Sequence, residues 1–410
     1  MTVEGDRKAT PPPPREERRT LTLVSASHAT QHMYVALLPL TYPAVVVAFH
    51  LSYAALGLGL GLVGVVGGCV QATAGVVSRR IPTRFILGGQ NILLGVCATL
   101  GGLSPSFAPW VATRGLSQVA ASQQHPVGSA VLSRRYPNRR GFALSTHVVG
   151  GNIGSLLVPV PAAILIVHIG WRGTMWVFAA PMVVMGLVFL LTFPHRADIS
   201  RHRSAAAPPS PGPRPPRLLD RRLAVLVILA STVAAGGRGL GTLSAFVPLY
   251  LRDGVHLPTI VVGLLFNLML AGGVLGPLVA GLLSDRFGRR RVLWTAYALS
   301  AVLVSLYGVA AHQAAVLIPL TLGVGLVAYA ESPLLQALLS EAVSRESQAT
   351  IFGYYFAIAY GVGSLWVIAL GFIIQDIGFA AGFLMMGASY VLAGCILIPA
   401  RGRRPSVAAG

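Results

Sequence analysis

Two histidines one helical turn apart stand in a long apolar segment near the start of the sequence. His28 and His32 share one face of the helix expected over 21–47, and Gln31 lies beside them. The same spacing occurs in zinc sites, but no cysteine or acid accompanies the pair nearby, so no metal site is expected. We interpret these polar side chains as the lining of a substrate-binding cavity, with helix packing as the alternative.

A second polar pattern occupies the helix expected over 109–132. Arg114, Gln118, Ser122 and His125 recur with helical spacing and form one stripe, which we predict also lines the cavity. An arginine at the middle of a membrane helix costs about 2.5–3.5 kcal/mol on insertion scales and usually faces a cavity or a partner. Arg114 is therefore predicted to act in substrate binding or coupling, and a structural tether or an interfacial position is the alternative. His125 is also a candidate for proton coupling.

Two residues of opposite charge lie in apolar segments of the second half. Arg238 stands among glycines in the helix expected over 223–250, where a guanidinium could reach an anionic ligand directly. Glu331 is the only carboxylate of the sequence within an expected membrane segment. A buried carboxylate can change its protonation state with its surroundings, because loss of water favours the neutral form. Glu331 is thus a candidate for proton coupling or substrate contact, and a structural ion pair with an arginine is the alternative.

The elements that carry these residues are predicted to be membrane helices. Of all residues, 54% are hydrophobic and 10% are charged, which is not the composition of a soluble chain. A bilayer core of about 30 Å requires about 20 apolar residues per helix, and six charge-poor intervals each have room for two helices. These intervals are 21–78, 85–133, 141–195, 223–284, 292–340 and 347–400. The sequence therefore predicts an all-α membrane protein with twelve transmembrane helices in two six-helix halves.

Basic residues gather in alternate loops rather than in one patch. The net charge is +19, yet all 31 lysines and arginines except Arg114, Arg172, Arg238 and Arg252 lie at the termini or in every second loop. This positive-inside pattern predicts that both termini are cytoplasmic. No basic patch is interleaved with aromatic residues, so nucleic acid is not an expected partner.

The two halves are expected to be joined by a linker rich in proline and arginine, which is not expected to pack. The predicted organisation is a disordered cytoplasmic tail over 1–20, a first half over 21–193, the cytoplasmic linker over 194–222, a second half over 223–400 and a cytoplasmic tail over 401–410. No cofactor and no enzymatic activity are expected.

Two observations support that last expectation. The run Gly59-Leu-Gly61-Leu-Val-Gly64 formally matches a dinucleotide fingerprint, but it stands inside an apolar segment, so we interpret its glycines as contacts between helices. A phosphate loop of the ATP-hydrolysing type is absent, and the membrane segments offer no nucleophile with a base and an orienting partner.

One charged motif interrupts the apolar pattern of the second half. It reads Gly281-Leu-Leu-Ser-Asp285-Arg286-Phe-Gly288-Arg289-Arg290-Arg291. A weaker copy runs from Gly75 to Arg84 in the first half, with Arg79 where the acid would stand. The repeat indicates that the chain consists of two related halves.

These features resemble the major facilitator superfamily, whose loop signature G-x-x-x-D-R-x-G-R-R matches 281–290. Within it, the chain looks like the fosmidomycin-resistance type of efflux protein. The stretches that carry this resemblance are Ser27-His28 with Pro39, His125-Pro126, Arg140-Gly141-Phe142-Ala143 with Gly150-Gly151-Asn152 and Gly154-Ser155, and Arg238 with Phe246-Val-Pro248-Leu-Tyr250. The chain departs from the pattern at His32, where many relatives are expected to have an acid.

The resemblance implies a central cavity lined mainly by the first, fourth, seventh and tenth helices, opened to each side in turn as the halves rock. We expect a monomeric secondary transporter of the plasma (bacterial inner) membrane that exports a small anionic organic solute or drug, with protons as the coupling ion and the lipid bilayer around it. The alternatives are proton symport uptake of a carboxylate or sugar, and a membrane receptor or assembly protein that does not transport.

The charged motif is predicted to form a cytoplasmic gate. Its residues would be Gly281, Asp285, Arg286, Gly288, Arg289 and Arg290. We expect Asp285 to pair with an arginine nearby or with the end of a neighbouring helix, and so to hold this side of the second half shut.

Overall fold

The computed structural model describes residues 15–71, 73, 80–194, 218–310, 314–344 and 347–398. Most of the two expected tails, most of the linker and residues 75–79 of the loop copy lie outside these ranges. Within them the chain is helical, and the antiparallel bridge between Leu218 and Val343 is the one extended pairing of the described residues.

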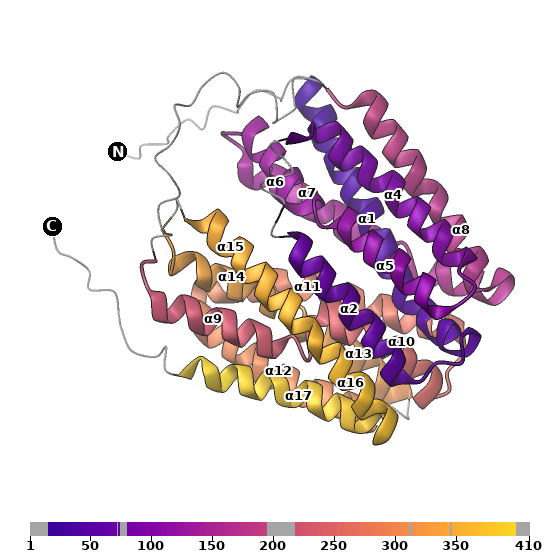
Figure 1. The fold of residues 1–410 in the computed structure, drawn as a ribbon. Helices are drawn as coiled ribbons and strands as arrows, with labels where there is room; N and C mark the ends of the chain where they lie inside the picture. Colours follow the sequence, from indigo (N-terminus) through magenta and orange to yellow (C-terminus); the bar gives the residue numbers. More distant parts are fainter. Residues whose placement is uncertain are drawn as a thin grey trace.

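The helices fall into two groups that follow the order of the chain. The first half contains α1 (Arg15–Ala48), α2 (Tyr53–Gln71), α4 (Thr83–Leu103), α5 (Phe107–Ala121), α6 (Gln124–Arg135), α7 (Arg140–Leu156) and α8 (Pro159–Thr192). The second half contains α9 (Arg221–Ala234), η3 (Gly239–Leu243), α10 (Ser244–Leu249), η4 (Tyr250–Gly254), α11 (Thr259–Phe287), α12 (Arg289–Ala310), α13 (Ala314–Ala328), α14 (Glu331–Glu341), α15 (Gln348–Phe356), η5 (Ala357–Gly361), η6 (Val362–Ser364), α16 (Leu365–Asp376) and α17 (Phe379–Ile396). In Figure 1 the indigo to magenta helices and the rose to yellow helices form these groups, and α2 lies against the second one.

Ten helical stretches of the described residues are long and apolar enough to cross a membrane, against twelve expected. The fourth expected helix is not among them, because it is divided near Ser122 into α5 and α6. The fifth and sixth appear as one stretch, Arg140–Thr192, whose 53 residues would be about 80 Å long if fully helical. That is more than twice the bilayer core of about 30 Å. The backbone is interrupted there at Gly170, where φ is 72°.

The two parts of α8 pack against different helices. Before Gly170, Ala163 lies against Gly263 of α11, in the second half. After it, Val183 and Leu190 lie against Gly95 and Gly88 of α4. Because each part has its own packing partner, the interruption at Gly170 separates two segments with different roles: one contacts the other half and one completes its own.

The halves meet closely along α2. A side-chain carbon added at Gly57 would lie 2.7 Å from the carbonyl oxygen of Val367, and one at Gly68 would lie 2.4 Å from the Cα of Gly361. Glycines at helical spacing thus let the backbone of α2 approach α16 and η5, as small residues do in membrane helix pairs. The interpretation of this segment as a helix contact, rather than a nucleotide site, agrees with the packing.

Hydrogen bonds join the halves at the end of the molecule where α2 begins. The hydroxyl of Tyr53 donates to Asp253 Oδ2 at 3.1 Å, and its backbone N–H donates to Gln375 Oε1 at 3.0 Å. These bonds hold the two halves together at this end of the molecule, and the glycine contacts continue the joint along α2.

Candidate functional site

Arg238 occupies a break in a helix of the second half. The α-helix α9 ends at Ala234 and the π-helical segment η3 begins at Gly239, with a non-helical backbone at Leu240 and Gly241. The break is crowded by its neighbours, because a side-chain carbon at Gly239 would lie 2.2 Å from the Tyr329 ring. The glycines therefore allow other helices to come close while the arginine side chain points inward.

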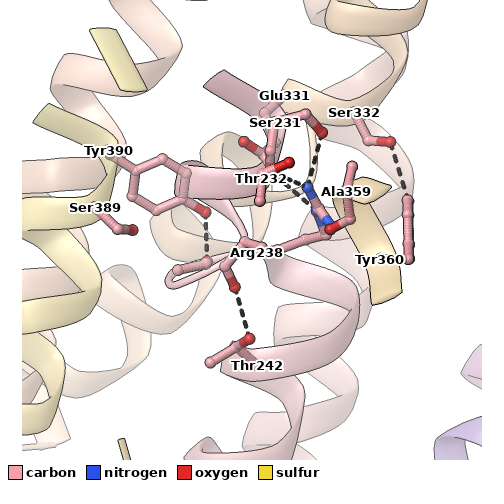
Figure 2. Close-up of polar contacts among 12 residues, drawn as sticks. Ser231, Thr232, Arg238, Thr242, Glu331, Ser332, Ala359, Tyr360, Ser389 and Tyr390 are labelled. Carbon is pink, nitrogen blue, oxygen red and sulfur yellow. Dashed lines mark hydrogen bonds and ion pairs between the residues drawn. The ribbon is translucent and has the colours of Figure 1, made fainter. Parts of the chain in front are cut away.

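The guanidinium of Arg238 is held by several acceptors (Figure 2). Its Nε donates to Glu331 Oε1 at 3.1 Å and its Nη1 donates to the carbonyl oxygen of Ala359 at 3.1 Å. Its Nη2 donates to the carbonyl and hydroxyl oxygens of Ser231, at 2.5 and 2.9 Å. The ring of Tyr360 lies 4.5 Å from the guanidinium carbon, at a distance typical of a cation–π contact. Most donors of this side chain are thus already used within the second half.

Glu331 reaches this arginine from another break, between α13 and α14. It is the first residue of α14, where the partial positive charge of a helix N-terminus favours a carboxylate. The side chain is only 1% exposed, and its Oε2 has no hydrogen-bond partner within the described structure. Of the two roles considered from the sequence, the pairing with an arginine is the one seen in the geometry. One carboxylate oxygen nevertheless stays free to take a proton.

Arg114 lies buried in the first half without a carboxylate beside it. Its Nη1 donates to the hydroxyl oxygens of Tyr34 at 3.2 Å and Ser117 at 2.7 Å. Its Nε has no partner within the described structure, and the residue is 7% exposed. Among the described residues, the ion pairs are those of Arg135, Arg238 and Arg289. Within the described part of the chain, no neighbouring acid therefore neutralises the positive charge of Arg114.

The expected stripe of Arg114, Gln118 and His125 is divided between two helices. Because the chain breaks near Ser122, Arg114 and Gln118 belong to α5 and His125 belongs to α6. Gln118 is half-buried beside α2, where a carbon added at Gly67 would lie 2.8 Å from its Nε2. Arg114 and His125 both lie beside α1, through Tyr34 and His28, whereas Gln118 lies beside α2.

Histidines of the first half lie together. His28 and His32 of α1 have ring centroids 4.4 Å apart, and the ring of His125 lies 4.8 Å from that of His28. His147 of α7 stacks on His28 at 4.1 Å. Gln31 does not join them, since its Nε2 donates to the carbonyl oxygen of Ala121 at 3.1 Å. Three of the expected cavity residues thus form one cluster, to which the fold adds a fourth histidine.

A buried polar network that was not expected from the sequence lies next to this cluster. Asn91 donates to Ser27 Oγ at 2.6 Å, and Ser27 donates in turn to Gln124 Oε1 at 3.0 Å. Gln90 donates to the same oxygen of Gln124 at 2.8 Å. The signal for this network in the sequence was the pair of adjacent amides, Gln90 and Asn91, in an otherwise apolar helix. The network fixes α1, α4 and α6 relative to one another.

The predicted gate residues lie at the junction of α11 and α12. Asp285 and Arg286 are exposed in the last turn of α11, and Gly288 ends the helix with φ of 90°, a conformation that favours glycine. A carbon added at Gly281 would meet nothing within 4 Å. Asp285 makes no ion pair among the described residues, so the pairing expected for it is not found there.

The arginines that follow connect α12 to its neighbours. Arg289 Nη1 donates to Glu341 Oε1 at 2.6 Å and to the carbonyl oxygen of Ala337 at 3.0 Å, which joins α12 to the end of α14. Arg290 lines a cavity of about 530 Å³ together with Leu223 and Leu397. At this end of the second half, the ion pair among the described residues therefore joins Arg289 to Glu341 and does not involve Asp285.

Comparisons with known proteins agree with this architecture. The sequence profile of a family described as the Major Facilitator Superfamily matches residues 24–367 and 227–410. The chain is 23% identical over 370 residues to the uncharacterized MFS-type transporter YfnC of Bacillus subtilis (strain 168), covering 87% of each chain. It is 25% identical over 366 residues to the fosmidomycin resistance protein of Escherichia coli (strain K12), covering 86% of each. The solved structure of the nucleoside transporter NupG superposes with a TM-score of 0.75 at 13% identity, covering 95% of this chain and all of the other.

Proposed function

Because this chain belongs to the major facilitator superfamily, we propose that it is a secondary transporter that exports a small anionic organic solute in exchange for protons. The observation that carries the proposal is the buried positive charge of Arg114, which no acid neutralises among the described residues. Such a charge is costly inside a membrane protein unless a ligand or partner compensates it. An anionic solute would supply that compensation.

The two arginines have different proposed roles because they have different partners. Arg238 already has Glu331 as counter-ion, whereas among the described residues the hydrogen bonds of Arg114 go to the hydroxyl groups of Tyr34 and Ser117. Arg114 is therefore the primary anion-binding group of the proposal, and Arg238 is secondary. The similarity to a fosmidomycin resistance protein supports a phosphonate or a related anion as the class of solute.

Glu331 is the proposed proton carrier. Its free Oε2 can take a proton, and protonation removes the counter-ion of Arg238. Conversely, an anion that binds Arg238 displaces the carboxylate and favours its protonation, because a buried carboxylate without a partner is unfavourable.

That coupling favours a second candidate function. When anion binding promotes protonation of Glu331, the anion and the proton bind together, which is the basis of proton symport rather than of exchange. Uptake of a carboxylate or sugar by symport is therefore the alternative, and the similarity to a resistance protein is what favours export.

Proteoliposomes with an imposed pH gradient separate these possibilities. With the membrane potential clamped, exchange predicts accumulation of labelled fosmidomycin when the vesicle interior is acidic. Symport predicts accumulation when the interior is alkaline. These signs do not depend on how the protein is oriented. Binding of the solute without any movement across the membrane would instead identify a receptor, the alternative of another class.

Replacement of Arg114 by glutamine is expected to weaken solute binding about 10- to 100-fold, since a hydrogen bond to a charged group contributes about 1.5–3 kcal/mol. The rise in the concentration for half-maximal transport measures this effect. Arg172→Gln is the matched control, because Arg172 is a half-buried arginine whose Nη1 donates to the carbonyl oxygens of Gly102 and Ser104. Equal effects of the two substitutions would exclude Arg114 as the binding group.

We also propose that Asp285 acts in gating on the cytoplasmic side. Asp285→Asn is then expected to lower the maximal transport rate severalfold while the concentration for half-maximal transport stays unchanged. Asp376→Asn, at an exposed acid at the end of α16, serves as control. A change in solute affinity alone would contradict the gating role.

A further inference from the structure

The histidine cluster of the first half has a geometry that the transport proposal does not use. His28 and His32 come from α1 and His125 comes from α6, two helices that lie close together in Figure 1. The nitrogen atoms that these three rings offer as ligands all lie within 4.8 Å of one another. The pair on α1 alone lacked a third ligand, and the fold provides it from a helix that begins more than 90 residues later.

His28 presents a free nitrogen to this cluster. Its Nδ1 lies 2.7 Å from the carbonyl oxygen of His147. A carbonyl oxygen only accepts hydrogen bonds, so Nδ1 carries the hydrogen and Nε2 has its lone pair available. The residue is 2% exposed, and Nε2 has no partner within the described structure. A metal-binding histidine characteristically donates its other N–H to a carbonyl oxygen in this way.

The other rings have matching features. His32 Nδ1 lies 3.0 Å from Ser155 Oγ, which gives this ring an outer partner too. The position of the His28 ring is fixed by the stacked His147 and by Gly151, where an added carbon would lie 2.6 Å from Cε1 of His28. His125 is exposed and His32 is half-buried, so both rings have room to rotate toward the fixed one.

We propose that His28, His32 and His125 bind one divalent transition metal ion, of the Zn²⁺, Co²⁺ or Ni²⁺ class, through neutral imidazole nitrogens. Imidazole is a preferred ligand of these ions. Metal–nitrogen bonds of about 2.0–2.1 Å place two ligands of a tetrahedral ion about 3.3 Å apart. The rings must therefore close by up to about 1.5 Å from their present spacing, which rotation of His32 and His125 can provide.

The proposed site has an open fourth position. Three neutral ligands leave the double charge of the ion uncompensated, and no carboxylate belongs to the cluster among the described residues. Water, hydroxide or another anion would complete the coordination, as in sites with three histidines. The ligand class is thus a metal ion with an exchangeable oxygen ligand.

Titration of the purified protein with Zn²⁺ tests the site directly. The protein should carry an affinity tag without histidine, and binding should be measured by calorimetry in detergent. We expect one Zn²⁺ per chain, and we expect His125→Asn to weaken binding at least about 100-fold, the upper end of what loss of an outer partner causes. His168→Asn, at an exposed histidine of α8, should change nothing. Equal affinities of the wild type and His125→Asn, or no stoichiometric binding by the wild type, would overturn the proposal.

A rescue experiment separates metal binding from a loss of folding. A carboxylate can replace one of three histidines as a zinc ligand, whereas an amide is a poor substitute. His32→Asp is therefore expected to keep Zn²⁺ binding within about tenfold of the wild type, and His32→Asn to lose it. Both variants should elute as single species in gel filtration. If His32→Asp and His32→Asn lose binding equally while both remain folded, His32 is not a ligand and the three-histidine site is wrong.

Discussion

Removal of the Glu331 carboxylate is expected to destabilise the protein by about 3–5 kcal/mol, because it leaves the buried Arg238 without its counter-ion. Arg238 and Glu331 are 5% and 1% exposed, so water cannot replace the lost partner. Glu331→Gln keeps the shape of the side chain and changes its charge. A lower unfolding temperature in detergent measures the effect.

The double variant Arg238→Met with Glu331→Leu tests whether the ion pair is only structural. Replacement of both members of a buried ion pair by apolar residues is often neutral or stabilising by about 1–4 kcal/mol. We therefore expect the double variant to regain the stability that Glu331→Gln loses, but not the transport activity. A double variant that transports normally would show that the pair is only structural.

The same substitution tests the coupling role of Glu331. Glu331→Gln cannot exchange a proton at this position, so its transport is expected to become independent of the pH gradient, while exchange of labelled for unlabelled solute persists. If transport by Glu331→Gln still responds normally when the gradient is collapsed, another group carries the proton. Loss of both modes of transport by a variant that still elutes as a single folded species would place the defect in solute binding.

A methyl group at Gly68 is expected to oppose the packing of α2 on the second half. The added carbon would lie 2.4 Å from the Cα of Gly361, a backbone atom that cannot move aside alone. Overpacking of this kind costs about 1–3 kcal/mol. Because the penalty applies only to the state in which these helices touch, the population of that state should fall about 5- to 150-fold.

Spin labels across the joined end of the halves can measure this change. Ser52→Cys and Asp376→Cys place labels at exposed residues near the Tyr53 and Gln375 contact. Gly68→Ala should shift the distance distribution toward longer values. Gly115→Ala is the matched control, because a carbon added at Gly115 meets nothing within 4 Å. Identical distributions for both variants would mean that the α2 contact does not control the equilibrium.

The class of the fold could be predicted from the sequence because it depends on local properties. Apolar intervals of sufficient length specify membrane helices, since every backbone group in lipid must be satisfied within its own segment. The polar residues inside those intervals could be recognised for the same reason, because each one is costly unless it has a partner. Neither property depends on which helices are neighbours.

Periodicity could not predict where the helices break. The stripe from Arg114 to His125 assumes one continuous helix, but the chain divides near Ser122, so these two residues belong to different helices although both contact α1. Likewise, Arg238 and Glu331 each lie at a break, and these two breaks bring them together. The position of a break depends on contacts with other helices, so spacing along the chain does not predict it.

The partners of the charged and titratable groups were decided by tertiary packing alone. The sequence left Glu331 with two possible roles, and the contact with Arg238, 93 residues away, identifies its neighbour. In the sequence, His28 and His32 are a pair without a third ligand. In the folded chain, α6 places His125 beside them. Composition and spacing establish which residues are unusual in a membrane, because the free-energy cost of a polar residue in an apolar segment is a local property. Which of them neutralise, bind or leave each other unpaired depends on distances between helices, which only the folded chain defines.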